Sequence, residues 1–323
     1  MKKGLISVIM SVYNEKLQWL NEAIESIINQ TYKNIEFIII VDNPSNLVLI
    51  ETIKNYQKQD KRIKYFINES NQGLVYSLNR ALRECTGQYI ARMDADDISH
   101  LNRFENQLKH IEDNNLDLIG SNVNLFKDNN KIFFTTDKLL THKYLKKMLA
   151  IGTIGIIHPT FFGKKEIFEK LNGYSNSLHT EDIEFLARVF CSNFKVGNIK
   201  DILLDCRYNN KSITKTNAIF VNKIGIYVVK VFKECLKTGT YNFDEDYHKG
   251  LNISTQEKED SNKKQILMGE ARKELNDKNY FKFLYNIVKA TSYSRSVLIS
   301  IRINLMLKLL KVMENIELKG VEK

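Results

Sequence analysis

Short apolar runs alternate with amphipathic stretches along the first hundred residues of the chain. The runs are too short for helices, so we expect buried strands over residues 5–10, 35–41, 63–67 and 89–93. Between them, apolar residues recur at the spacing of one helix face, which predicts helices over about 17–30, 46–59 and 75–82. Because strand and helix alternate with short links, this part of the chain is expected to form a parallel, doubly wound sheet.

The pattern after residue 100 predicts further elements with longer connections. A helix with Phe104, Leu108 and Ile111 on one face precedes a predicted strand over 116–123 and a charged loop to about residue 145. Helices over 164–171 and 183–190 and a strand near 202–208 follow, and the remainder reads as helices with a polar linker over about 240–263. We therefore expect an α/β domain over 1–215 and a helical C-terminal region over 216–323.

Composition places the chain among ordinary globular proteins. Of its 323 residues, 43% are hydrophobic and 27% are charged, and only 2 prolines and 14 glycines occur, which excludes collagen-like and low-complexity classes. The first residues lead directly into strand-like sequence, so no signal peptide is expected. No stretch of about 18 uncharged apolar residues occurs, so no membrane-spanning helix is expected.

The four cysteines are widely separated and form no CxxC pair. They stand at Cys85, Cys191, Cys206 and Cys235. This spacing favours reduced thiols in a cytoplasmic protein over a disulfide scaffold or a zinc site.

The net charge of +10 is concentrated near the C-terminus. Residues 278–313 hold seven cations and no acid: Lys278, Lys282, Lys289, Arg295, Arg302, Lys308 and Lys311. A basic arm of this kind indicates an acidic partner, either a membrane surface or a nucleic acid.

Three carboxylates follow the fourth predicted strand within four residues: Asp94, Asp96 and Asp97. Like charges this close resist burial unless a cation or hydrogen-bond donors compensate them. If the backbone stays extended, Asp94 and Asp96 point to the same side, and two hard oxygen ligands suit Mg²⁺ or Mn²⁺ holding a substrate phosphate. The alternative is an acidic loop that caps the next helix through Asp97 or Ser99.

Polar residues gather where the other predicted strands end. Residues 13–14, 42–43, 68–73 and 94–97 occupy these positions, and parallel sheets bind ligands at this edge. No GxGxxG follows the first strand, and no GxxxxGK[ST] occurs in the chain, which argues against dinucleotide and P-loop sites.

Further polar candidates lie in the second half of the domain. His158 stands inside the apolar run 151–162, where a histidine is commonly a satisfied structural residue. Glu181 and Asp182 precede a helix, and acids in a first turn are the ordinary preference of a helix dipole. Each of these residues is therefore either structural or part of a site.

Six segments, in this order and spacing, together resemble the inverting glycosyltransferases of family 2. They are SVIMSVYNE, IIIVDNPS, NQGLVYSLNRAL, YIARMDADD, IIHPTFFGKKEIFEKLNGY and EDIEFLARV, and the match covers about residues 4–215. The resemblance implies a bacterial polysaccharide-type enzyme with the GT-A fold. This fold is a Rossmann-like, mostly parallel central sheet flanked by helices, here with a helical C-terminal extension.

The resemblance also implies roles for individual residues. The implied donor site consists of Val12, Tyr13, Asn14, Asp42, Asn43, Gly73, Asn79, Asp94, Ala95 and His158. Tyr13 is implied near the base, which either Asp42 or Asn43 reads. Asp94 is placed near the ribose and shares the metal, Mn²⁺ or Mg²⁺, with Asp96. Asp182 is the implied general base, with Glu181 beside it.

The function that follows is transfer of a sugar, in the manner of a hexosyltransferase, from a nucleotide-sugar to a hydroxyl of a glycan or lipid-linked acceptor. A UDP-sugar is the expected donor, cell-surface polysaccharide synthesis the expected role, and the cytoplasmic face of the membrane the expected location. Two other classes remain open from the residues alone. One is a sugar-nucleotide pyrophosphorylase or nucleotidyltransferase, which normally carries a Gly-rich basic loop after the first strand. The other is a non-enzymatic nucleic-acid-binding protein, although no RNA-binding motif accompanies the basic arm.

The last predicted helix has a wide apolar surface. From residue 296 to 314 its polar positions recur at helical spacing, and the remaining positions are almost wholly Val, Leu, Ile and Met, apart from Arg302. The apolar surface must be covered by an anionic membrane, by the catalytic domain or by a second copy of the chain in a homo-oligomer. The excess of cations favours lipid, and no nucleic-acid partner is expected.

Overall fold

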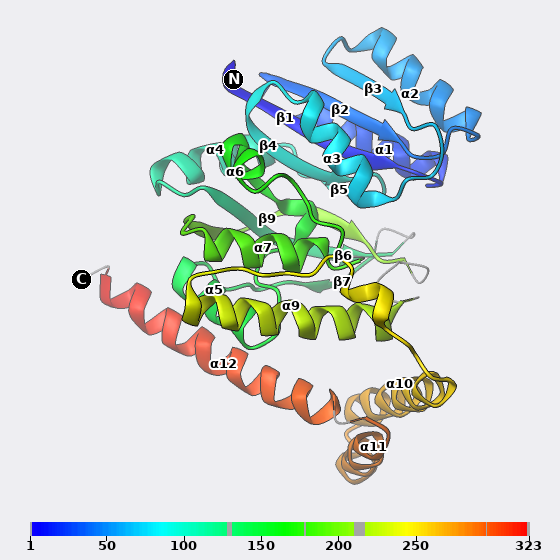
Figure 1. The fold of residues 1–323 in the computed structure, drawn as a ribbon, viewed down its shortest axis with the longest axis vertical. Coiled ribbons are helices and arrows are strands. Elements are labelled where there is room, and N and C mark those ends of the chain that lie inside the picture. The colour runs from blue at the N-terminus through cyan, green and yellow to red at the C-terminus, as the bar shows by residue number, and fades with distance from the viewer. Residues whose placement is uncertain (1, 128–130, 178, 210–216, 295, 322–323) are drawn as a thin grey trace.

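A computed structural model describes residues 2–127, 131–177, 179–209, 217–294 and 296–321, and it places one nine-stranded sheet at the centre (Figure 1). The strand order is β3-β2-β1-β4-β8-β6-β9-β5, and β7 pairs with β6. The strands are β1 (Lys2–Val12), β2 (Ile35–Val41), β3 (Ile63–Ile67), β4 (Gly87–Asp94), β5 (Ile98–Ser99), β6 (Leu118–Phe126), β7 (Ile132–Thr135), β8 (Phe162–Lys164) and β9 (Val196–Arg207). The predicted order of elements is confirmed for the first four of these strands, which are parallel.

Helices cover both faces of the sheet. They are α1 (Leu17–Ile28), α2 (Leu47–Gln59), α3 (Leu74–Glu84), α4 (Arg103–Asp113), α5 (His142–Ala150), α6 (Lys165–Lys170), α7 (Glu181–Cys191) and α9 (Ala218–Thr238). Side chains of β2 alternate between two cores, with Phe37 and Ile39 in one and Ile38 and Ile40 in the other. The first core includes α1, α2 and α4, and the second includes α3, α5, α6, α7 and α9. Burial on both faces explains why β2 is apolar at nearly every position.

The C-terminal region is helical, as expected from its sequence. It continues from α9 through the short turn η2 (Tyr247–Gly250) to α10 (Thr255–Asn276), α11 (Tyr280–Tyr293) and α12 (Ser296–Val321). Figure 1 shows α12 running back beneath α9 and α5, away from the sheet. The predicted division at residue 215 and the cation Arg295 lie outside the described residues. No helix in the described part of the chain is long and apolar enough to cross a membrane.

Two of the predicted connections are wrong. The charged loop expected up to residue 145 contains β7 and the start of α5, whose buried Tyr144, Leu145 and Met148 follow helical spacing between lysines. The linker expected to residue 263 ends at α10, which begins with a capping box between Ser254 and Glu257.

The expectation of reduced thiols is wrong for two of the four cysteines. Cys191 at the end of α7 and Cys235 on α9 form a disulfide, with 6.5 Å between their Cα atoms. They are 44 residues apart in sequence but meet because α7 packs against α9, and no local spacing signals such a contact. Cys85 and Cys206 are buried free thiols.

One face of α12 is held by the α/β domain. The buried Glu314 carboxylate accepts hydrogen bonds from the backbone N–H groups of Leu140 at 2.9 Å and Thr141 at 2.8 Å, and from the Thr141 hydroxyl at 3.0 Å. Thr141 is the N-cap of α5, so Glu314 satisfies donors at a helix N-terminus. Lys311 adds an ion pair to Asp137. Packing on the domain therefore accounts for this face of the helix but not for the opposite one.

Candidate active site

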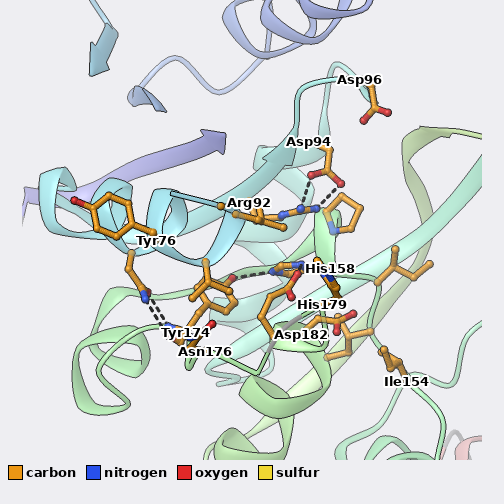
Figure 2. A pocket seen from close by; sticks show the side chains of 18 of the residues that line it. Tyr76, Arg92, Asp94, Asp96, Ile154, His158, Tyr174, Asn176, His179 and Asp182 are labelled. Atoms are coloured by element: carbon orange, nitrogen blue, oxygen red, sulfur yellow. Dashed lines mark hydrogen bonds and ion pairs between the residues drawn. The ribbon is translucent and has the colours of Figure 1, made fainter. Parts of the chain in front are cut away.

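A cavity of about 1050 Å³ opens beside the carboxyl ends of β1 and β4. Its walls include residues from the end of β4, the start of α3, the turn η1 (His158–Thr160) and the first turn of α7. Figure 2 shows Asp94 and Asp96 toward one end and Asp182 toward the other, with Arg92 and His158 between them. The fold thus assembles one site from segments that are far apart in sequence.

The predicted site residues divide into two groups. Seven line the cavity: Gly73, Asn79, Asp94, Asp96, His158, Glu181 and Asp182. Among the described residues, six others do not line it: Val12, Tyr13, Asn14, Asp42, Asn43 and Ala95. Val12 and Ala95 are buried, whereas Tyr13 is 43% exposed just beyond β1. The contacts with the base that the resemblance implies for these residues stay a prediction.

Asp42 supports the loop between β3 and α3. Its buried carboxylate accepts hydrogen bonds from the Asn68 side chain at 2.7 Å and from the N–H groups of Gln72 and Gly73 at 2.8 Å each. Gly73 has φ of +85°, a conformation that favours glycine, and it opens α3. Asn43 is more exposed than Asp42. The choice between these two residues for reading the base stays a prediction.

Arg92 is the buried cation of the site. It lies two residues before Asp94 on β4, so the two side chains share a face of the strand. Its guanidinium is 4% exposed and forms an ion pair with the Asp94 carboxylate, with Nη1 2.6 Å from Oδ2 (Figure 2). Its Nε has no hydrogen-bond partner among the described residues. A buried donor without a partner carries an energetic cost.

The carboxylates around Arg92 outnumber it. Burial and the charges of Asp94 and Glu15 raise the pKa of Asp96 to about 7. Burial also raises the pKa of Glu15, whose carboxylate accepts the Tyr13 N–H at 2.8 Å. Crowded like charges of this kind favour either a bound proton or a bound cation.

Asp94 and Asp96 fit a hard divalent cation by their donor chemistry. A turn at residues 95 and 96 follows β4, so the extended geometry assumed from the sequence is not observed, although both aspartates still line the cavity. Within the described chain, no group of three or more His, Cys, Asp or Glu side chains could hold a metal ion. Two carboxylates leave coordination positions for phosphate and water, which is how Mg²⁺ is commonly bound.

The helix-cap interpretation of Asp97 and Ser99 is wrong. Asp97 is buried and accepts the backbone N–H of Arg207 at 2.9 Å, which ties the loop after β4 to β9. The Ser99 hydroxyl accepts from Gln30 at 3.2 Å, and α4 begins later, with Asn102 at its N-cap. Ile98 and Ser99 form the short strand β5, which pairs with β9, and Asp97 directly precedes it.

Glu181 and Asp182 form the second acidic pair of the cavity. Burial and the neighbouring Asp182 raise the pKa of Glu181 to about 7, and burial raises the pKa of Asp182. Both stand in the first turn of α7, and Asp182 Oδ1 accepts the Ile183 N–H at 2.7 Å. The two residues therefore both begin the helix and line the cavity. Carboxylates with raised pKa values are suited to proton transfer near neutral pH.

His158 lies between the two acidic pairs. Its Nε2 is 3.1 Å from the Tyr174 hydroxyl, and its Nδ1 is 3.9 Å from Glu181 Oε1. Burial and the charge of Arg92 lower the pKa of His158 well below its usual value, which keeps the ring neutral at pH 7. It is thus both a satisfied buried histidine and a wall of the cavity.

Comparison with known proteins decides what kind of site this is. Residues 7–172 match the profile of Glycosyl transferase family 2. The chain belongs to this family. Among its relatives are the uncharacterized glycosyltransferase MJ1057 of Methanocaldococcus jannaschii, 39% identical over 65% of this chain and 73% of that protein, and the O-antigen biosynthesis glycosyltransferase WbnJ of Escherichia coli, 32% identical over 71% and 89%.

Solved structures support the GT-A fold of this family 2 glycosyltransferase. The crystal structure of S. aureus TarS 1-349 in complex with UDP-GlcNAc superposes with a TM-score of 0.56 at 14% identity, covering 92% of this chain and 91% of that one. The mannosyltransferase PcManGT from Pyrobaculum calidifontis, in complex with GDP-Man and Mn²⁺, gives 0.53 at 14% identity over 73% and 65%. The family assignment decides against the pyrophosphorylase and nucleic-acid-binding alternatives.

Several cavity residues of this glycosyltransferase were not predicted from the sequence, among them Glu15, Arg92, Lys138 and Tyr174. Arg92 had a signal, because it precedes Asp94 by two residues on a predicted strand. Glu15 had a weaker one as an acid directly after the first strand. Tyr174 ends the fifth of the segments that carry the resemblance, although no role was implied for it. Lys138 lies in a connection whose pattern predicts no spatial neighbours.

Proposed function

We propose that this family 2 glycosyltransferase is a metal-dependent, inverting enzyme. It moves a sugar from a nucleotide-sugar to a hydroxyl of a glycan or lipid-linked acceptor. The proposed donor is a UDP-sugar, and the proposed role is cell-surface polysaccharide synthesis. The observation that carries the proposal is the shared cavity. Asp94 and Asp96 lie toward one end of it and Asp182 toward the other, and Glu181, which precedes Asp182 in the first turn of α7, also lines it.

The donor end suits a diphosphate. When bound by Asp94 and Asp96, Mn²⁺ or Mg²⁺ supplies charge neutralisation for the leaving diphosphate. Arg92 holds Asp94 in place through its ion pair and adds a positive charge beside it. The structure of PcManGT in complex with GDP-Man and Mn²⁺ supports a metal on this fold.

The other end suits deprotonation of an acceptor hydroxyl. Asp182 takes the hydroxyl proton as the acceptor oxygen attacks the anomeric carbon and the bond to the leaving phosphate breaks. The raised pKa of Asp182 brings the carboxylate closer to the pH at which it works. Attack from the face opposite the leaving group inverts the anomeric configuration.

The exposed face of α12 extends the proposal to a membrane. Five exposed apolar side chains recur along one side of the helix: Leu298, Leu305, Leu309, Val312 and Ile316. Arg302 and Lys308 are also exposed, whereas both acids of the helix bind the catalytic domain. We propose that this side lies on an anionic membrane surface, since apolar burial and basic side chains act together there.

Product analysis tests the proposed reaction. Purified protein should release UDP from a UDP-sugar in the presence of Mn²⁺ and an acceptor glycan, and should stop when EDTA is in excess. NMR of the anomeric proton should show the configuration opposite to that of the donor. Full activity in EDTA, or a product with retained configuration, would contradict the proposal.

A further inference from the structure

A second cavity adjoins the catalytic one on the side of Asp182. It has a volume of about 340 Å³, and Lys138 and Ile154 line both cavities. Its other walls are mostly apolar or small and come from α5, the 152–154 loop, α7 and α9: Leu149, Gly152, Thr153, Ile183, Gly225 and Val229. Figure 2 shows Ile154 beyond Asp182, at the end opposite to Asp96. The second cavity therefore belongs to the acceptor end of the site.

Lys138 is an uncompensated cation at the junction of the two cavities. Its ammonium donates one hydrogen bond, to the Ile154 carbonyl at 3.3 Å, and it forms no ion pair with a carboxylate of the described residues. Burial lowers the pKa of Lys138, and no neighbouring charge acts against that shift. The adjacent Asp137 pairs with Lys311 instead, at 2.6 Å. A partly buried ammonium with one long hydrogen bond leaves two donors for an anion.

The segment that carries Lys138 is held firmly. Lys311 donates to the Lys138 carbonyl at 3.2 Å, and Glu314 binds the N–H groups of Leu140 and Thr141. The far side of the second cavity reaches α12, because a Cβ on Gly152 would lie 3.8 Å from Ile303 Cδ1. A ligand that extends from Asp182 past Lys138 thus runs toward the helix proposed to lie on the membrane.

From this arrangement we infer that Lys138 and the second cavity bind the phosphate and the start of the apolar chain of a lipid-linked acceptor. The inference rests on the proposed function and specifies its acceptor. Lys138 binds the phosphate that joins the accepting sugar to the chain, and the chain passes over Leu149, Ile154 and Val229 toward α12. The donor diphosphate is the wrong anion for Lys138, because Asp94 and Asp96 lie at the opposite end of the cavity.

Binding of decyl phosphate, below its micelle concentration, to the full-length protein tests the inference by calorimetry. Lys138→Met keeps the apolar stem and removes the charge, so its affinity should fall about 10- to 100-fold, the usual loss for hydrogen bonds to a charged group. Lys147→Met, which removes an exposed cation of α5, is the matched control and should bind as the wild type does. Decanol should bind less tightly than decyl phosphate to the wild type and equally to wild type and Lys138→Met.

A second variant tests the apolar part of the site. Gly225→Leu on α9 fills the second cavity, where a Cβ would already contact Ile183 Cδ1 at 3.7 Å. This variant should bind decyl phosphate more weakly than the wild type and inorganic phosphate equally well. Its melting temperature should be near that of the wild type. Equal decyl phosphate affinity in Lys138→Met and wild type would overturn the inference.

UDP binding in Mn²⁺, measured on the same samples, separates this inference from the proposed function. UDP affinity should be the same in wild type and Lys138→Met. A loss of UDP affinity in Lys138→Met with decyl phosphate unchanged would move Lys138 to the donor and overturn the inference. A wild type that binds decyl phosphate through Lys138 but no nucleotide would contradict the proposed donor and leave the phosphate site in place.

Discussion

At the scale of residues, the site is governed by one buried cation among several acids. Arg92 lowers the pKa values of Asp96, Glu181 and Asp182, while burial raises all three more strongly. Arg92 is thus a positioning residue that pairs with Asp94 and tunes the carboxylates on both sides of the cavity.

Replacing Arg92 should therefore shift the pH dependence of the reaction. In Arg92→Met the acidic limb of the rate profile should move to higher pH, because the carboxylates lose a stabilising charge. The free energy of unfolding should also fall by about 1–3 kcal/mol, since Asp94 loses its partner but is partly solvated. The pH profile of kcat/KM is the measurement, and Arg92→Lys should recover part of the shift. A pH profile that does not shift in Arg92→Met would show that Arg92 has only a packing role and does not influence the carboxylates.

Stability should depend on pH through Asp96 and Glu181. Their pKa values are raised from 3.8 and 4.5 to about 7, so the stabilisation that they gain from protonation is complete below about pH 4 and is lost as pH rises through 7. A divalent cation replaces the proton only once Asp96 ionises. Mn²⁺ should consequently raise the melting temperature more at pH 8 than at pH 5.5. In Asp96→Asn this difference should largely vanish, and an equal Mn²⁺ effect at both pH values in the wild type would argue against the metal site.

At the scale of elements, the strands were predictable because burial on both faces makes them continuous apolar runs. The third strand agrees with its predicted range 63–67, and the fourth extends by a few residues to Gly87–Asp94. Helices with lysines between their apolar positions were harder to predict from the sequence. Helix α5 was missed although Tyr144, Leu145, Met148 and Leu149 have helical spacing. The first part of α10, up to residue 263, was assigned to the linker although its capping box was visible in the sequence.

The contact between α12 and α5 yields a prediction at this scale. Glu314→Gln should lower the free energy of unfolding by about 1–2 kcal/mol, because the amide loses charge-assisted bonds to the N-terminus of α5. Glu317→Gln, which alters an exposed pair with Lys143, should have a smaller effect and serves as its control. Urea unfolding of both variants gives the comparison. A Glu314→Gln protein as stable as the control variant would show that α12 docks through its apolar contacts alone.

At the scale of the whole molecule, the family motifs located the two acidic pairs but not how the chain connects them. The disulfide and the docking of Glu314 depend on contacts between segments 44 or more residues apart, which no local pattern encodes. The exposed side of α12 was anticipated as a wide apolar surface. The structure adds that its opposite side is occupied by the catalytic domain.

Membrane binding is a property of this larger scale. Leu305→Gln combined with Leu309→Gln should reduce sedimentation with liposomes that contain anionic lipid, and high salt should weaken binding of the wild type because the basic side chains are screened. Both leucines are exposed, so the variant should fold normally. Full-length protein that ignores such liposomes and forms a dimer split by the same variant would make this side an oligomer interface.

The most direct test of the account is the effect of Asp182→Asn on sugar transfer. The amide keeps the shape of the side chain but cannot accept the acceptor proton, so kcat should fall by about 10²–10⁴. The affinity for UDP in Mn²⁺ should stay within about twofold of the wild type, since Asp182 lies at the end of the cavity away from Asp96. Near-native turnover in Asp182→Asn would contradict its role as the base and return it to a helix-start residue, with Glu181→Gln as the next variant to measure.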